Sequence, residues 1–464
     1  MSSPTLKASI LALLLTGTLP QLGLTQTTSG PLQTPIEAQR RLSTAKFSTM
    51  LPIATVGASE GLLAELEKSI DPDVTAIVIE SGSFTLSDLA RAAAEKKLAS
   101  ITEKSSGNVS ISAPLVIWKG AELKVGKDEY VLLDASGSSL ILNAGTLSVT
   151  GAFLEGTAST DPENAFRPFI LSVADGGAAV TGSTIQHLGF GSFPETSGLS
   201  FLGRGYSLSS ASIHVSDNEI TDLVSLSLIR SAKSVVTNNR LAAMRSSAIV
   251  MQSSANADVR DNTLVASGGH GIRITSQSQD ITLLGNTVTG SKSHGIFVDD
   301  GSVLVSVSHN RVEKSGLSGV MLKQSGCSSV AGNIIDDNAL SGIRAEASFG
   351  VRISDNTISK NRDGLTFEGQ AGNSPTNILR NIFVRNVAGI RSDALGDLRI
   401  ADNDFSRQWT RLFAGAIASS TGRYLASQDA VSNSDFLLKS DTSAASVQLA
   451  SFSAFGLAAC NSKV

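Results

Sequence analysis

The sequence predicts an all-β fold: a single-stranded right-handed parallel β-helix of about 13 coils of 22–25 residues, with a small α/β cap at its N-terminal end. The main observation is an internal repeat, in which an asparagine is followed two residues later by an aliphatic or aromatic residue, at a mean interval near 23 residues. A Gly-aliphatic pair follows most of these asparagines, and alternating apolar pairs precede them. Three short strands per repeat, with no helix between them, are typical of coils that stack about 4.8 Å apart.

The two recurring columns have structural explanations. Asparagine tolerates the left-handed turn conformation, and its amide can hydrogen-bond to the backbone and to its neighbours along the stack, so we expect structural columns rather than ligands. We expect the glycines to serve the turn into the next strand. The sequence lacks the regular leucine pattern of a leucine-rich repeat. A β-propeller is also disfavoured, because its blades would repeat at about 40 residues or more. The asparagines are Asn218, Asn239, Asn262, Asn286, Asn310, Asn333, Asn356, Asn381 and Asn403, and the glycines are Gly271, Gly295, Gly319, Gly342, Gly364 and Gly389.

The composition narrows the functional classes. The chain has 464 residues, of which 41% are hydrophobic, 17% charged and 5% aromatic, a balance that is atypical of disordered or coiled-coil proteins. Lys and Arg number 37 against 41 Asp and Glu, for a formal net charge of −4. This balance gives no basic field that would recruit nucleic acid, so we expect no nucleic-acid partner.

The order of segments predicts four parts. Residues 1–26 have one lysine and a short apolar run, and we interpret them as an export signal rather than a spanning helix. We therefore expect a periplasmic, or secreted, protein with no membrane span in its mature form. Residues 27–110 form a linker and the α/β cap, with helical spacing over 58–70 and 86–98 and a strand over 74–80; residues 111–410 form the β-helix, and residues 411–464 a C-terminal cap or tail.

Cysteine, metal and cofactor signals are weak. Cys327 and Cys460 are too few for a disulfide framework, and the sequence leaves open whether they pair. No fixed His/carboxylate spacing predicts a metal site, and no nucleotide-binding loop is present, so we expect no cofactor.

Charged residues recur on the strand that follows each Gly-aliphatic pair. If that strand alternates between inward and outward positions, its outward side chains line a groove at a spacing that suits an extended sugar chain. Arginine and lysine would then meet sugar carboxylates, and acidic residues would assist proton transfer. The alternatives are a solvated, charge-balanced ladder, or a glycosidase pair formed by the adjacent-coil Glu346 and Glu368. The substrate-binding candidates are Asp299, Lys323, Arg344, Glu346, Glu368 and Arg391.

Two histidines occupy the same repeat position. His270 and His294 stand directly before the glycine of neighbouring coils, so we expect them to stack. With Arg273 nearby, the pair would supply a base and a group that neutralises a carboxylate, and we take all three as catalytic candidates. The alternative is a pair of turn histidines that hydrogen-bond locally.

Several stretches carry a family resemblance. They are LVIWKGAELKV (115–125), LILNAGTLSVTGAFLEG (140–156), ENAFRPFILS (163–172), IQHLGFGSFPETSGLSF (185–201) and the coil segments HGIRI, HGIFV and DNALSGI. Over residues 115–404 the chain resembles the periplasmic mannuronan C5-epimerases of alginate-producing bacteria, which are right-handed β-helices. The resemblance implies an exported protein that acts on an acidic exopolysaccharide.

The chain departs from that family at the catalytic motif. The family's Asp-Pro-His-Asp sequence precedes the first His-Gly-Ile, where this chain has Ile249–Val250–Met251–Gln252, or Val250 to Ser253 with the register shifted by one. The family arginine corresponds to Ser276, and the tyrosine before the motif to a serine near Ser247. Of that site, His270 alone has a matching residue.

The resemblance therefore predicts the fold more firmly than the activity. Epimerisation at C5 needs a cation to stabilise an enolate-like carboxylate, a base to take the proton and an acid to return it. We expect an exopolysaccharide-modifying protein, epimerase-like or lyase-like, with relocated catalytic groups. The alternative is a non-catalytic homologue that binds the polymer, with an export or assembly complex as a further partner.

Overall fold

A computed structural model describes residues 39–52, 58–71, 73–159, 166–173, 176–204, 212–370, 376–393, 398–430 and 436–438. All of them belong to one compact unit, residues 38–464. The expected export signal at 1–26 lies outside the described residues, as do Cys460 and most of the expected tail.

The N-terminal cap contains the strand and both helices that the spacing predicts. Helix α3 begins with a capping box in which Thr85 and Asp88 satisfy each other's backbone N–H groups. Strand β1 pairs with β2 in antiparallel fashion, and β3 pairs likewise with β4. The elements are β1 (Arg41–Lys46), a 3-10 turn (Phe47–Thr49), α2 (Leu62–Ser69), β2 (Thr75–Thr85), α3 (Leu86–Glu95), β3 (Ile101–Ser105) and β4 (Asn108–Ile111).

The parallel stack begins earlier than residue 111, where the sequence placed its start. Residues 77–79 of β2 pair in parallel with residues 115–117, and residues 82–85 pair in parallel with residues 121–124. One long strand therefore supplies the first rung of two sheets. The cap and the first coil are built from the same segment.

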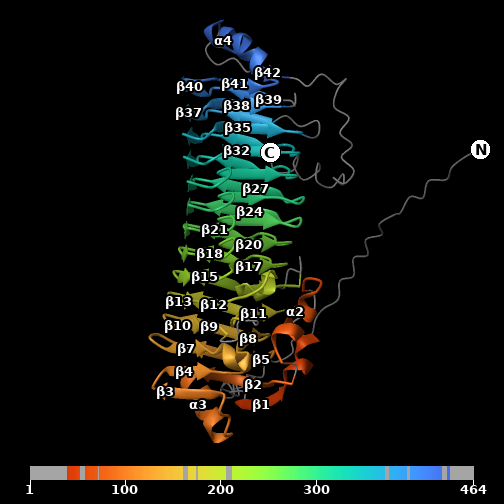
Figure 1. The fold of residues 1–464 in the computed structure, drawn as a ribbon, viewed down its shortest axis with the longest axis vertical. Helices are drawn as coiled ribbons and strands as arrows, with labels where there is room; N and C mark the ends of the chain where they lie inside the picture. The colour runs from red at the N-terminus through yellow and green to blue at the C-terminus, as the bar shows by residue number, and fades with distance from the viewer. Residues whose placement is uncertain are drawn as a thin grey trace, which may run out of the picture. The chain divides into compact units, whose positions relative to one another are not determined.

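Three parallel sheets run along the stack, and each coil contributes one strand to each of them (Figure 1). Strands β5 to β40 make twelve consecutive three-strand coils. Sheet A contains β5 (Pro114–Ile117), β8 (Leu140–Asn143), β11 (Ile170–Val173), β14 (Gly198–Leu202), β17 (Ser225–Ile229), β20 (Ile249–Gln252), β23 (Ile272–Thr275), β26 (Ile296–Val298), β29 (Val320–Lys323), β32 (Ser341–Glu346), β35 (Asp363–Glu368), β38 (Ala388–Ser392) and β41 (Phe413–Gly415).

The other two sheets follow the same order. Sheet B contains β6 (Ala121–Val125), β9 (Thr146–Thr150), β12 (Gly177–Thr181), β15 (Ile213–Ser216), β18 (Val235–Thr237), β21 (Asp258–Arg260), β24 (Gln279–Leu284), β27 (Val303–Ser308), β30 (Ser329–Ala331), β33 (Arg352–Ser354), β36 (Thr376–Leu379) and β39 (Leu398–Ala401). Sheet C contains β7 (Tyr130–Leu133), β10 (Phe153–Gly156), β13 (Thr184–Gln186), β16 (Glu219–Thr221), β19 (Arg240–Ala242), β22 (Thr263–Val265), β25 (Thr287–Thr289), β28 (Arg311–Glu313), β31 (Ile334–Asp336), β34 (Thr357–Ser359), β37 (Ile382–Val384) and β40 (Asp404–Arg407).

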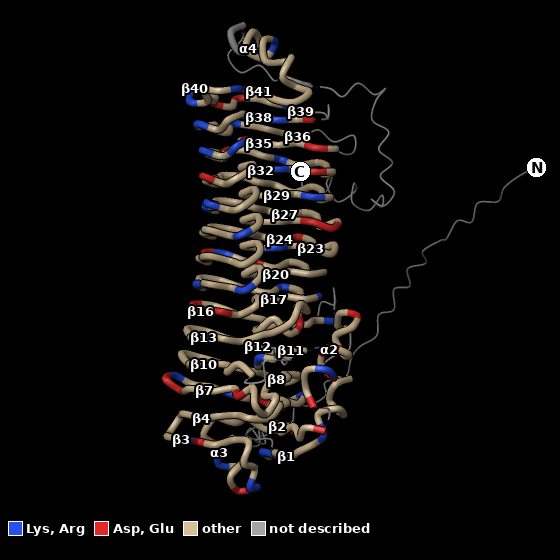
Figure 2. Tube along the Cα trace, in the orientation of Figure 1, with Lys and Arg blue, Asp and Glu red and all other residues tan. Residues whose placement is uncertain are grey.

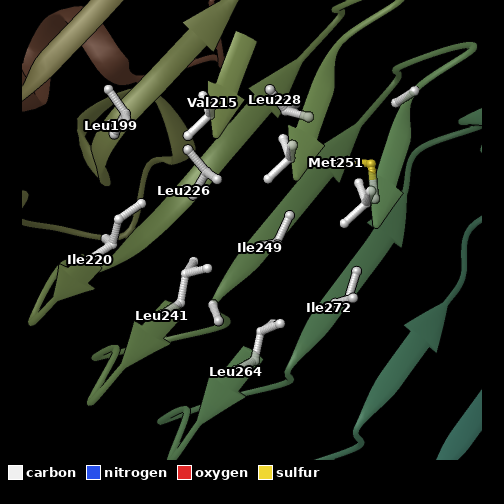
Figure 3. Packing of buried hydrophobic residues seen from close by; sticks show 14 of the residues in the cluster. Leu199, Val215, Ile220, Leu226, Leu228, Leu241, Ile249, Met251, Leu264 and Ile272 are labelled. Atoms are coloured by element: carbon white, nitrogen blue, oxygen red, sulfur yellow. The ribbon is translucent and has the colours of Figure 1, made fainter. Parts of the chain in front are cut away.

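The interior of the coils is filled by stacked aliphatic side chains. Leu226, Ile249 and Ile272 are register partners on sheet A, and each is fully buried. Leu241 and Leu264 form the matching pair on sheet C, so the two sheets meet across one apolar interior (Figure 3). A single coil could not exclude water from such side chains, so each coil depends on its neighbours.

The asparagine column confirms the predicted hydrogen-bonded ladder. The Asn286 amide donates to Asn310 Oδ1 at 3.0 Å and to the Val259 carbonyl at 2.9 Å, and the pattern repeats along the stack. The left-handed conformation belongs instead to the residue before each asparagine, such as Asp261 or His309. A second ladder, Asn338–Asn361–Asn386, ends at Gln408 and was not predicted.

The glycine column is explained by close packing rather than by turn conformation. Gly319 does not have a positive φ, but a Cβ there would lie 2.6 Å from Ile335 Cγ2 and 2.8 Å from the Gly342 carbonyl oxygen. At the glycines that begin these sheet A strands, the backbone therefore approaches sheet C too closely for a side chain.

The C-terminal end of the interior is covered by aromatic side chains. Tyr424 is 2% exposed and packs against Phe405, Phe413 and Phe436. The covering elements after β41 are a 3-10 turn (Ala418–Ser420), α4 (Thr421–Ala430) and β42 (Phe436–Leu438), which pairs with β39 in antiparallel fashion. The described part of the C-terminal segment therefore caps the last coil.

The charged residues of the β-helix are mixed in sign along its length. Basic and acidic residues are both spread along the length of the stack rather than gathered by sign (Figure 2). Cys327 is disulfide-bonded. Within the described residues, no helix is both long and apolar enough to cross a membrane.

Candidate functional site

The outward face of sheet A is divided into a covered part and an open part. Over the first coils its side chains, such as Leu202 and Ile229, belong to an apolar cluster with residues of the cap and of the loops before β11 and β14. The cluster includes the rings of Phe166, Phe169 and Phe190, which lie within 6.5 Å of one another between centroids. Among the described residues, none beyond β17 belongs to this cluster, so from β20 onward the face is uncovered by it and carries charged side chains together with Val250, Phe297 and Met321.

The open part contains the residues predicted from the sequence. Arg273, Arg344 and Arg391 belong to one outward column of sheet A, and Lys323, Glu346 and Glu368 are register partners in the next. His270 lies two residues before the start of β23, and His294 lies two residues before the start of β26. Asp299 directly follows the end of β26. We call this face, from His270 to Arg391, the sheet A strip.

The two histidines stack as predicted. The rings of His270 and His294 have centroids 5.5 Å apart and planes within 1° of each other, and the Phe297 ring contacts both. The His294 backbone N–H donates to His270 Nδ1 at 3.3 Å, and the Ser318 N–H donates to His294 Nδ1 at 3.1 Å. Because Nδ1 accepts in both rings, the neutral tautomer carries its proton on Nε2.

The environment keeps both rings neutral. Partial burial and the nearby His294 and Arg273 lower the pKa of His270 to about 4. Partial burial and Arg344 likewise lower the pKa of His294 to about 4. At neutral pH each ring is therefore a hydrogen-bond donor through Nε2–H, an arrangement that favours ligand binding over the general-base role.

Arg273 is held beside this pair. Its Nη2 bonds to Asp299 Oδ2 at 3.0 Å, and its guanidinium lies 5.7 Å from the Phe297 ring centroid. Arg273 Nε and Asp299 Oδ1 are buried and have no hydrogen-bond partner among the described residues. Both side chains therefore keep unused hydrogen-bonding capacity at the strip.

A second charged group lies further along. Arg344 Nη2 bonds to Glu368 Oε2 at 2.6 Å and to Glu346 Oε2 at 3.2 Å, while Lys323 bonds to Glu346 Oε1 at 3.2 Å. The arginine therefore joins the two carboxylates that sequence reasoning considered as a glycosidase pair. Arg344 Nε is buried and has no partner in the described structure.

Sequence reasoning missed Asp363. Asp363 is 3% exposed and bonds to Arg391 Nε at 3.0 Å, and its Oδ1 has no partner among the described residues. The repeat could have identified Asp363, because it directly precedes the repeat glycine, as His270 and His294 do. It pairs in register with Ser341, which occupies the same position one coil earlier. Ser341 itself hydrogen-bonds to Thr366 at 2.8 Å.

Comparisons with known families decide the fold. A family model for right-handed β-helix regions matches residues 271–435, and a model for NosD, a periplasmic copper-binding protein, matches residues 195–325. The chain is a right-handed parallel β-helix. No curated protein matches the sequence significantly.

Solved structures extend the similarity of this β-helix. The crystal structure of the periplasmic alginate epimerase AlgG superposes with a TM-score of 0.62 and 18% identity, covering 81% of this chain and 92% of AlgG. A double mutant of AlgG gives a TM-score of 0.64 and 18% identity, covering 82% and 93%. At this identity the similarity establishes a shared fold.

The name of NosD as a copper-binding protein raises the question of a metal site among the described residues. Among them, no group of three or more His, Cys, Asp or Glu side chains is arranged to hold a metal ion. We derive no chemistry for this β-helix through a metal.

Proposed function

We propose that this β-helix is an exported, periplasmic protein that binds an acidic exopolysaccharide along the sheet A strip and modifies it, as an epimerase-like protein. The observation that supports it is the row of cations on one open face. Arg273, Arg344 and Arg391 stand in one column, two of them with a buried Nε that no described residue satisfies. Guanidinium groups bind carboxylates bidentately, which suits a chain of uronate sugars.

The spacing of the strip fits a long polymer. Successive coils place equivalent side chains about 4.8 Å apart, so an extended sugar chain can contact one coil after another. The neutral histidines would donate through Nε2–H to sugar oxygens, while Lys323 and the arginines neutralise carboxylates. Asp299, Glu346 and Glu368 hold those cations in place and accept hydrogen bonds from sugar hydroxyls.

The chemistry proposed at C5 of a uronate is proton removal followed by proton return. A base takes the C5 proton, cations stabilise the enolate-like carboxylate, and return of a proton to the opposite face inverts the centre. If the neighbouring glycosidic oxygen leaves instead, the same first step gives a lyase. On the strip, Arg273 would bind a uronate carboxylate.

The second candidate is a polymer-binding protein without turnover, serving export or assembly. It is favoured by the hydrogen bonds that occupy Nδ1 of both strip histidines, and by the ion pairs that occupy the strip carboxylates. The two candidates share the binding face and differ in whether a C5 proton is exchanged.

Binding to polymannuronate and to a panel of acidic bacterial exopolysaccharides tests the shared part. We expect the triple variant Lys323→Ala, Arg344→Ala, Arg391→Ala to lose most retention in affinity electrophoresis, with binding that weakens as salt rises. The matched control is Arg260→Ala, Arg352→Ala, Arg380→Ala, which removes the same charge along sheet B. Equal retention by the two triple variants would contradict the proposed binding face.

A further inference from the structure

A second group of ionisable residues lies outside the sheet A strip, at the corner where sheet C leads into sheet A. We call Tyr130, Glu155, Arg167, His187, Asp222 and Arg245 the His187 cluster. It joins the coils of β7, β10, β13, β16 and β19, and Arg167 reaches it from the loop before β11. Hydrogen bonds and ion pairs link its members from end to end.

Asp222 orients the imidazole of His187. His187 Nδ1 lies 2.9 Å from Asp222 Oδ2. Although burial opposes it, hydrogen bonds from His187 and Arg167 and the charges of both arginines keep the pKa of Asp222 below its ordinary value. The ionised carboxylate can only accept, so Nδ1 donates and the lone pair of the neutral ring lies on Nε2. This is the reverse of the tautomer of His270 and His294.

Nε2 of His187 is available to a ligand. It makes no hydrogen bond to a described residue, and Glu155 Oε1 lies 4.0 Å from it. The His187 side chain is 43% exposed. An imidazole held by a carboxylate on one nitrogen, with the other nitrogen open to solvent, is the arrangement that general acid–base catalysis uses.

The neighbouring groups complete an acid–base environment. Tyr130 OH donates to Glu155 Oε2 at 2.5 Å, and burial together with this carboxylate raises the tyrosine pKa to about 12. Arg167 uses Nη1 for Asp222 at 2.9 Å and is 29% exposed, which leaves N–H groups for an anion. Arg245 Nε binds Asp222 Oδ1 at 3.1 Å, so it anchors the carboxylate from the other side.

The cluster lies at the closed end of the sheet A strip. Arg245 Nη2 donates to the carbonyls of Leu188 and Gly189 at 2.6 Å, which fastens the covering loop to the coil of β20. His187, Asp222, Ala243 and Ala266 follow one another, one coil apart, through backbone hydrogen bonds. Three such steps span about 14 Å, and His270 follows Ala266 by four residues. The column of His187 therefore runs alongside the strip, four residues before the histidine column on each coil.

We propose that the His187 cluster is an acid–base centre, at which His187 exchanges the C5 proton of a uronate unit with solvent. The inference rests on the proposed function, since it takes the same acidic polymer as its substrate. The C5–H bond breaks as the proton passes to Nε2, and the electron pair delocalises into the sugar carboxylate, which faces Arg167. Water then supplies the proton of the new C5–H bond, and the hydroxide formed takes the proton from His187. Return on the opposite face inverts C5.

Chemical rescue separates this role from a structural one. His187 has a φ of +60°, a conformation that glycine adopts without strain, so His187→Gly should fold and leave a space the size of an imidazole. Wild type incubated with polymannuronate in D₂O should incorporate deuterium at C5, measured by NMR. We expect His187→Gly to lose about a hundredfold or more of that rate, and added imidazole to restore part of it.

The matched control is His309→Gly, because His309 has a φ of +54° and lies at the end of sheet B. It should exchange like wild type. Asp222→Asn tests the positioning role: it should slow exchange and leave polymer retention unchanged.

Each outcome decides the inference. Loss in His187→Gly, with polymer retention unchanged and imidazole rescue, supports it. Exchange that survives in His187→Gly, or polymer that binds to wild type without any exchange, overturns the His187 centre and leaves the binding face intact. Absence of binding to every acidic polymer overturns the proposed function, and the inference falls with it.

Discussion

His270 and His294 lie with their imidazole planes within 1° of each other, and the backbone N–H of His294 donates to Nδ1 of His270. The same contact is repeated from Ser318 to His294. The two imidazoles therefore extend the hydrogen bonding between coils, because each accepts a backbone N–H from the next coil. The stability of this stack depends on both rings staying neutral.

The histidine pair makes stability depend on pH. Each pKa is lowered from 6.5 to about 4, so between these values the unfolded chain binds more protons than the folded one. The stabilisation is complete above about pH 6.5 and is lost as the pH falls toward 4. It amounts to at most about 3 kcal/mol per ring, and less where solvent screens the charge.

Urea unfolding at a series of pH values measures this effect. We expect the variant His270→Asn, His294→Asn to show a flatter loss of stability between pH 6.5 and 4 than wild type. His309→Asn, at an exposed turn, serves as the control and should keep the wild-type slope. An unchanged slope in the double variant would contradict the assigned protonation state.

The asparagine ladder should be costly to interrupt. Asn286 is fully buried, accepts from the backbone and the amide of Asn262, and donates to Asn310. Asn286→Ala leaves these groups unsatisfied, and we expect a loss of about 2–4 kcal/mol in the free energy of unfolding. Thr287→Ala, on the next residue and facing outward, should change it by about 0.5 kcal/mol or less. A similar cost for the two variants would mean that the column is not a hydrogen-bonded support.

The glycine column should fail for steric reasons. Gly319→Ala places a methyl group against Ile335 and the Gly342 carbonyl, and should cost about 2–3 kcal/mol in urea unfolding. Gly369→Ala is the comparison, because Gly369 has a φ of +54° but nothing within 4 Å of its Cβ position. It should cost about 1 kcal/mol, from backbone strain alone. The reverse order would show that conformation, rather than packing, selects these glycines.

The C-terminal cap should protect the last coil. Tyr424→Ala removes the ring that packs on Phe405 and Phe413, and should cost about 3–5 kcal/mol or open the end of the stack. Limited proteolysis would then cut β40 to β42 earlier than in wild type. Leu425→Ala changes a neighbouring side chain that is 47% exposed, and should leave the cleavage rate unchanged.

The regular coils were predictable because the interval between repeated residues gives the length of each coil. Because Asn286 and Asn310 occupy the same position on neighbouring coils, the strand register of one coil predicts that of the next. The alternation of inward and outward side chains along each strand then predicts that Arg273, Lys323 and Arg344 face outward. The pairing partners of those cations were harder to predict. Arg344 has charged neighbours along its own strand and on adjacent coils, and only the side-chain geometry selects Glu368 as the close one.

The His187 cluster was not predictable in the same way. His187 and Asp222 stand at one position of successive coils, but long loops precede β14 and β15, and the repeat loses its period there. Arg167 lies 55 residues before Asp222, and the loop that brings it back has no repeat signal.

The sequence by itself determined the architecture, because the asparagine spacing and the alternation of apolar residues act between neighbouring coils and recur along the chain. Only the tertiary structure decided which side chains are free to react. His270 and His294 share a motif with a catalytic appearance, yet the backbone N–H groups above them occupy Nδ1. His187 belongs to no motif, yet Asp222 on the next coil binds its Nδ1, and no described residue hydrogen-bonds to its Nε2. The protonation of an imidazole depends on contacts within about 3 Å, and these are set by packing rather than by period.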